Sequence, residues 1–169
     1  VGFQIKVGEI AFHSNDLETC RALYDRALKR SQAAIQKNPN NAAAQRAMAL
    51  SCGALGDFHL QLAEPTVALP YYNQSRELMV KLAAGDPDNA ATRRGLSFSH
   101  YRVATAFLLA GDPVEAQKDY QTCLELRNDI AALDPRNAHK QIDLMIALAR
   151  CGEHAEAAQV ASKLGSRAS

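Results

Sequence analysis

A segment of 48 residues that repeats along the chain limits most strongly what this sequence can fold into. Three short stretches, NPNNA, DPDNA and DPRNA, place prolines at Pro39, Pro87 and Pro135, in two equal steps of 48 residues. One complete copy runs from Ala90 to Ala138. Similarity at one fixed period is the signature of a repeat architecture, in which each copy packs against its neighbours.

The copies also share residue types at fixed positions. One position is always tyrosine (Tyr24, Tyr72 and Tyr120), one is acidic (Asp16, Glu64 and Asp112), and one is asparagine (Asn41, Asn89 and Asn137). Two further positions hold small residues: Cys20, Ala68 and Ala116 at the first, and Ala27, Ser75 and Cys123 at the second. Small residues let two helix backbones approach closely, and the aromatic ring fills the space beside them. A fourth copy is shorter: residues 152–157 match 111–116 at a step of 41, so about two helical turns are missing.

Between these marks, apolar residues recur mostly three and four positions apart, which predicts helices. Pro65 suits a first turn, whereas Pro70 predicts either a late start of its helix or a kink. No stretch alternates as a strand does. We therefore predict an all-α fold of four antiparallel helix pairs, with helices at 1–14, 17–37, 41–62, 65–84, 89–110, 113–132, 137–151 and 153–164. They form one domain over residues 1–164, with repeats at about 1–40, 41–88, 89–136 and 137–164, and a disordered tail at 165–169.

Composition excludes several kinds of partner. The formal net charge is +1, so no strong field attracts nucleic acid or an anionic membrane. No apolar run approaches the roughly 18–20 residues of a membrane span.

Four scattered cysteines, two of them at small-residue positions, indicate reduced packing cysteines in the cytoplasm. The first residues resemble the middle of a helix and no signal peptide, so we expect the chain to be part of a longer protein.

No motif in the sequence predicts catalysis, a metal or a cofactor. There is no phosphate-binding glycine loop, no HExxH and no GxSxG. Cys151 and His154 are half a metal site at most, and Glu9 and His13, four residues apart, are better explained as a solvated helix pair. The basic and aromatic cluster is interpreted as a charged helix face, with an acidic peptide or a phosphate as the alternative ligand; its members are Arg93, Arg94, His100, Tyr101 and Arg102.

These residues resemble the tetratricopeptide family, which builds helix–turn–helix units with small and aromatic residues at set places and a proline after the second helix. The third copy carries the pattern at Ala104, Phe107, Ala116, Tyr120 and Cys123. The period is 48 rather than about 34, so the resemblance is to a long-period bacterial form, often found after a serine/threonine kinase or another signalling domain. It implies a right-handed superhelical solenoid.

The resemblance also implies a binding face, because in this family the first helix of each pair lines a concave groove for a partner. The matching positions are Ile5, Glu9, Phe12, Leu50, Asp57, Leu60, Phe98, Tyr101, Thr105, Leu108, Ile142 and Ile146. The family's clamp for a C-terminal carboxylate is not matched, because Glu9, Asp57, Thr105 and Ile146 stand where asparagine is expected. The alternative is that the longer helices bury these residues against each other.

We therefore predict a non-enzymatic interaction module, a scaffold or adaptor that binds an apolar peptide or an amphipathic helix of a partner protein. Nucleic acid and membrane are not expected as partners. Two alternatives belong to other classes. The chain could be a homo-oligomerisation element that forms a homodimer, or the regulatory region of an enzyme whose catalytic domain lies outside these residues.

Overall fold

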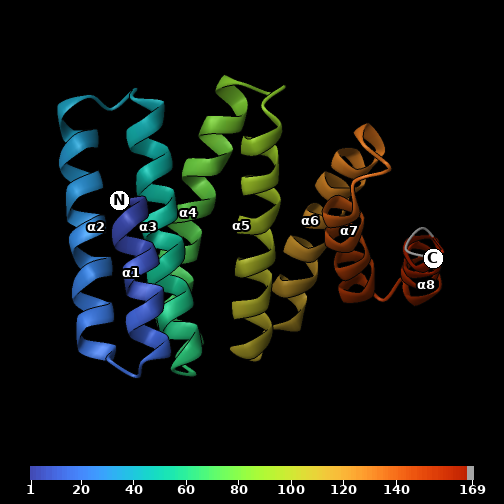
Figure 1. Ribbon diagram of the computed structural model, residues 1–169, viewed down its shortest axis with the longest axis horizontal. Helices are drawn as coiled ribbons and strands as arrows, with labels where there is room; N and C mark the ends of the chain where they lie inside the picture. The colour runs from blue at the N-terminus through green and yellow to red at the C-terminus, as the bar shows by residue number, and fades with distance from the viewer. Residues whose placement is uncertain (167–169) are drawn as a thin grey trace. The chain divides into compact units, whose positions relative to one another are not determined.

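The computed structural model of the chain describes residues 1–166, and this part is all-α, without a strand (Figure 1). Its helices are α1 (Gly2–His13), α2 (Leu17–Lys37), α3 (Ala42–Gln61), α4 (Pro65–Gly85), α5 (Ala90–Leu109), α6 (Pro113–Leu133), α7 (Ala138–Cys151) and α8 (His154–Gly165). The predicted all-α class is confirmed. Of the predicted tail, Gly165 is the last residue of α8, and residues 167–169 lie outside the described part.

The chain divides into two compact units, residues 1–86 with α1 to α4, and residues 87–169 with α5 to α8. Within each unit, helices that are consecutive in sequence pack against each other, and α1 also touches α3. This order of contacts is typical of repeat proteins, where each element meets mainly its neighbours. The division into one domain with four repeats stays a prediction.

Asparagine N-caps set the start of the first helix of three pairs. Asn41, Asn89 and Asn137 each accept a hydrogen bond from the backbone N–H three residues on, at 3.0, 3.0 and 3.3 Å. Such a cap satisfies an N–H that has no partner inside the helix. The stretch around each proline therefore ends one helix and caps the next.

The acidic position caps the second helix of two pairs. Asp16 and Asp112 each accept a hydrogen bond from the N–H three residues on, at 3.1 Å. Glu64 makes no such bond; its carboxylate contacts Nδ1 of His59 at 2.7 Å. Of the two outcomes expected for Pro70, the late start does not occur, because α4 begins at Pro65 and contains Pro70.

The tyrosines of the repeat pack into the space left by small residues. Tyr24 and Tyr72 are buried, and their rings lie where a Cβ at Gly8 or Gly56 would stand. In the third pair Ala104 takes the glycine position, and it packs with Ala116 and Tyr120. Complementary volumes of this kind let the two helices of a pair approach closely.

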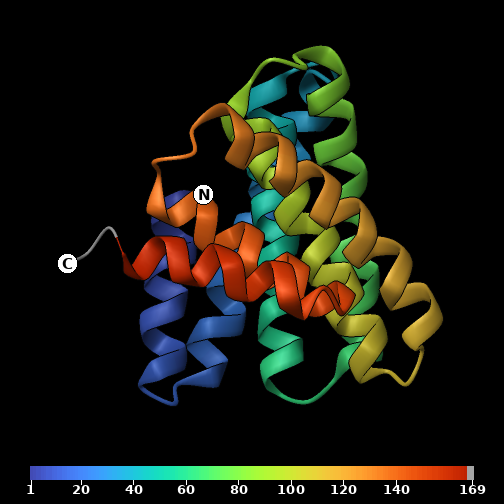
Figure 2. The same cartoon turned by 90° about the vertical axis from the view of Figure 1, so that its right-hand side faces the viewer.

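The last pair is built differently. α7 has 14 residues and α8 has 12, against 20 and 21 in α5 and α6. Figure 2 shows α8 running back along α7. Ala161 stands at the tyrosine position, and the core here is completed instead by Leu144, Ala147, Leu148 and Ala157.

Candidate functional site

All twelve predicted groove residues lie on the first helix of a pair, six in each unit, and none is fully buried. Five of them are large apolar side chains exposed by 37–46%: Leu50, Phe98, Leu108, Ile142 and Ile146. Glu9 is also exposed, and the others are half-buried: Ile5, Phe12, Asp57, Leu60, Tyr101 and Thr105.

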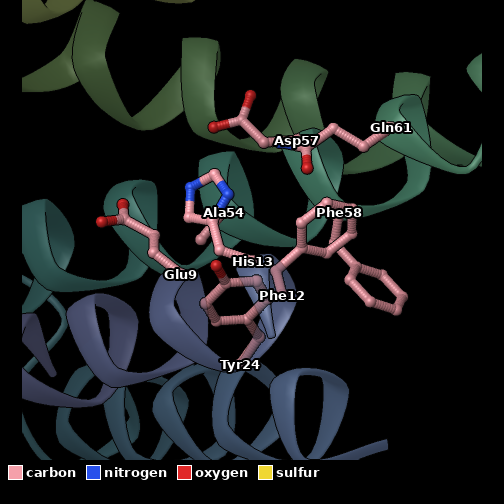
Figure 3. Close-up of a pocket in the computed structure, with 8 residues that line it drawn as sticks. All are labelled: Glu9, Phe12, His13, Tyr24, Ala54, Asp57, Phe58 and Gln61. Atoms are coloured by element: carbon pink, nitrogen blue, oxygen red, sulfur yellow. The ribbon is translucent and has the colours of Figure 1, made fainter. Parts of the chain in front are cut away.

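In the first unit, three of these residues line a pocket of about 210 Å³ between α1, α2 and α3. Glu9, Phe12 and Asp57 are joined there by His13, Tyr24, Ala54, Phe58 and Gln61 (Figure 3). The ring of Phe58 meets those of Phe12 and Tyr24 edge to face, with centroids 6.1 and 6.3 Å apart. The pocket thus has an aromatic wall and polar groups around it.

Two of the polar side chains of this pocket, Glu9 and Asp57, are carboxylates, and they lie there beside His13, Tyr24 and Gln61. The Tyr24 hydroxyl points toward the side of the pocket where Glu9, His13 and Asp57 lie (Figure 3). Burial, together with Cys20 and the two carboxylates, raises the pKa of Tyr24, so the phenol stays neutral. Asp57 also accepts a hydrogen bond from the Tyr72 hydroxyl at 2.8 Å, which fixes its position. Such a pocket suits a cationic or hydrogen-bond-donating group.

In the second unit, two groove residues of α5 are aromatic, and each has an arginine over its ring. The rings of Phe98 and Tyr101 are stacked, with centroids 6.2 Å apart and planes 7° apart. The guanidinium of Arg102 lies 4.3 Å from the Phe98 centroid, and that of Arg127 lies 5.1 Å from the Tyr101 centroid. A cation over a ring face is attracted by the ring's quadrupole.

A second pocket, of about 330 Å³, lies beside this stack and is lined from three helices of the unit. Its lining residues are Ala91, Arg94, Gly95, Ser97, Phe98, Arg127 and Asp143. Sequence reasoning missed Arg127 and Asp143. The positions 48 residues earlier hold Met79 and Gly95, so the repeat register did not indicate a charged residue at either place.

The predicted basic and aromatic cluster is divided by the fold. Arg93 pairs with Asp129 at 3.0 Å, and Arg94 pairs with Asp143 at 3.2 Å. His100 turns inward, where its Nδ1 lies 2.5 Å from the carboxylate of the buried Asp119. Only Arg94, of these three basic residues, lines the second pocket.

The cysteine thiols are free, and burial holds the pKa of two of them well above neutral. The pKa of Cys52 rises to about 12 and that of Cys123 to about 11. Their thiols therefore stay protonated at neutral pH. Residues 1–166 contain no group of three or more His, Cys, Asp or Glu placed to hold a metal ion. Cys151 and His154 are therefore not part of such a group.

No helix within residues 1–166 is both long and apolar enough to cross a bilayer.

Comparison with known proteins gives one family match. A family model described as "Protein of unknown function (DUF2753)" matches residues 4–110. No curated protein sequence matches the chain. Among solved structures, the chain is similar to a Podosopora anserina putative kinesin light chain with nearly identical TPR-like repeats (12% identity, 96% of this chain, 92% of that chain, TM-score 0.42). MamA of AMB-1 is also similar (14% identity, 97% of this chain, 96% of that chain, TM-score 0.38).

Proposed function

The chain belongs to the family of proteins of unknown function DUF2753, and we propose that it is an interaction module that binds a segment of a partner protein. The observation that carries the proposal is the exposure of large apolar side chains at the predicted groove positions. Leaving such side chains in water costs about 25 cal/mol for each Å² of apolar surface, a cost that a bound partner removes.

The placement of these side chains supports the same proposal. In the second unit, Phe98, Leu108, Ile142 and Ile146 all belong to first helices, α5 and α7, and in the first unit Leu50 belongs to the first helix α3. A partner that buries apolar residues at three- and four-residue spacing, such as an amphipathic helix, suits a surface of this kind. The four free cysteines support the predicted cytoplasmic location, and their protonated thiols support a role without catalysis.

The test is capture of a partner from lysate by the chain and by two variants. Phe98→Asp with Leu108→Asp places charge at groove positions, and Val114→Asp with Leu133→Asp places it at exposed apolar positions of α6, the second helix of the same pair. Circular dichroism checks that both variants fold. We expect the first variant to lose the partner and the second to keep it.

Two results would contradict the proposal. Loss of the partner in the α6 variant alone would move the interface to the second helices. Capture of only a second copy of the chain, with a mass that rises with concentration, would favour homo-oligomerisation instead.

A further inference from the structure

We propose that the pocket between α5, α6 and α7 is a carboxylate-binding site, which takes an aspartate or glutamate side chain of the partner segment. This inference rests on the proposed function and names the chemistry of one contact. Its starting point is Arg127, which is only 5% exposed although it carries a full positive charge.

Arg127 lacks a counter-ion in the described part of the chain. Its Nη1 donates a hydrogen bond to the backbone carbonyl of Asp143 at 2.8 Å. Its Nε is buried and has no hydrogen-bond partner among the described residues. The face of Tyr101, 5.1 Å away, is its other stabilising neighbour. Buried charges in proteins are normally paired and fully hydrogen-bonded, so an arginine in this state indicates a missing anion.

The pocket gives an anion access to this arginine. Arg127 lines the cavity of about 330 Å³ together with Arg94, whose side chain is 60% exposed. Planar guanidinium groups match carboxylates in shape and bind them through two parallel hydrogen bonds. The exposed ring of Phe98 forms an apolar wall of the same cavity. The site therefore fits an acidic side chain that has an apolar neighbour in the partner segment.

Asp143 indicates which anion the site selects. Its carboxylate lines the pocket and already pairs with Arg94, at 3.3 Å from Nε and 3.2 Å from Nη2. The charged side chains that line the pocket are Arg94, Arg127 and Asp143, and their net charge is +1. A singly charged carboxylate matches that charge, whereas a doubly charged phosphate would meet uncompensated repulsion from Asp143.

The site differs from the clamp described for the tetratricopeptide family. The clamp positions of this unit are Thr105 and Ile146, which carry no charge, and neither lines the cavity. Arg127 reaches it from α6, the second helix of its pair. An acidic side chain within a segment, rather than a chain terminus, is the expected ligand.

The experiment uses the full chain and a short peptide of repeated Ala-Glu-Leu, acetylated and amidated so that only its side chains are charged. A matched peptide carries Gln for Glu. Fluorescence anisotropy measures both affinities, and the Arg127 Nε–H resonance in NMR spectra reports contact. We expect the Glu peptide to bind about tenfold more tightly, since hydrogen bonds to charged groups contribute that much. We also expect it to shift the Arg127 resonance.

Four variants separate this site from a general charge effect. Arg127→Met and Arg94→Gln should each weaken the Glu peptide, and Arg94 is exposed enough that its loss leaves the fold intact. Asp143→Asn removes the internal competitor and should strengthen binding by about threefold. Arg150→Gln is the matched control, because Arg150 is an exposed arginine of α7 that does not line this pocket. This substitution should leave the affinity for the Glu peptide unchanged.

Equal binding of the two peptides, or no binding of either, would overturn the inference. Weaker binding of the Glu peptide by Asp143→Asn would also overturn it.

Failure of the carboxylate site can be distinguished from failure of the proposed function. A partner captured through Phe98 and Leu108 but insensitive to Arg94→Gln and Asp143→Asn would overturn the carboxylate site alone. A Glu peptide that binds as expected, with no partner lost by the groove variant, would overturn the interaction face alone.

Discussion

At the scale of single residues, the contact between a glycine and a tyrosine decides how closely the helices of a pair approach. The ring of Tyr72 occupies the position that a side chain at Gly56 would need, and its hydroxyl is held by Asp57. The ring of Tyr24 occupies the corresponding position beside Gly8. A ring fixed at both its face and its hydroxyl cannot move away cheaply.

Gly56→Ala should therefore destabilise the protein, although alanine favours a helix more than glycine does. The new Cβ would lie 2.9 Å from Cζ of Tyr72 and closer still to the edge of the ring. We expect a loss of about 1–3 kcal/mol in the free energy of unfolding, measured with urea. Gly85→Ala is the control, because a Cβ there meets nothing within 4 Å. A gain in stability from Gly56→Ala would contradict this expectation, because it would show that the Tyr72 ring moves aside at little cost.

Buried thiols make the protein less stable in alkali. Burial raises the pKa of Cys52 from 9.0 to about 12 in the folded state, so the unfolded chain loses this proton first. The contribution is fully present below pH 9 and is lost as the pH rises toward 12, at up to about 1.4 kcal/mol per pH unit. We expect urea midpoints in reducing buffer to fall above pH 9. Cys52→Ala should make that fall shallower, and an unchanged slope would contradict this explanation.

At the residue scale, sequence reasoning identified the buried positions well. The period alone selected Tyr24, Tyr72 and Tyr120, and all three are buried. It did not identify the caps made by Asn89 and Asn137, although both were seen in register, because a repeated asparagine does not say which N–H it accepts from. The contact of His100 with Asp119 was also missed, since a spacing of 19 residues carries no helical signal.

At the scale of elements, the helix ends agree closely with the sequence because caps and prolines set them. The predicted range 17–37 agrees with α2 to the residue, and each of the other helices differs by one residue at one or both ends. α4 is a helix that contains a residue unfavourable to helical structure. Pro70 lies inside it and cannot donate the hydrogen bond that the carbonyl of Thr66 would accept.

Pro70→Ala should stabilise the protein by about 1–3 kcal/mol, because it restores the missing hydrogen bond and removes the clash of the ring with the preceding turn. Pro65→Ala is the matched control. Pro65 is the first residue of α4, where no intrahelical hydrogen bond is lost, so its replacement should change stability by less than about 0.5 kcal/mol. Thermal and urea unfolding give both values. A destabilised Pro70→Ala variant would mean that the proline fixes the start of the helix.

At the scale of the whole molecule, sequence reasoning predicted the first helices as the binding face, and this stays a prediction, because exposed apolar side chains also lie on α4 and α6. The pockets between helices were not predicted. The choice of first helices came from the family resemblance, and Phe98 and Leu108 are exposed as a binding face requires. Tyr101, predicted on the same face, is half-buried and packs with Tyr120 and Arg127, so its place in a binding face stays a prediction. Burial of a long side chain such as Arg127 depends on three helices at once, which no local pattern encodes.

The most direct test of the central claim is photo-crosslinking in lysate, with a benzoylphenylalanine placed singly at Leu108, Ile142 and Ile146 on α5 and α7, the first helices of the second unit. Val114 and Leu133, exposed on α6, are the matched control positions. We predict that the first-helix positions crosslink to one segment of the same partner protein and that the control positions do not. Crosslinks that form mainly from Val114 and Leu133, or only to a second copy of the chain, would contradict the proposal that the first helices bind a partner.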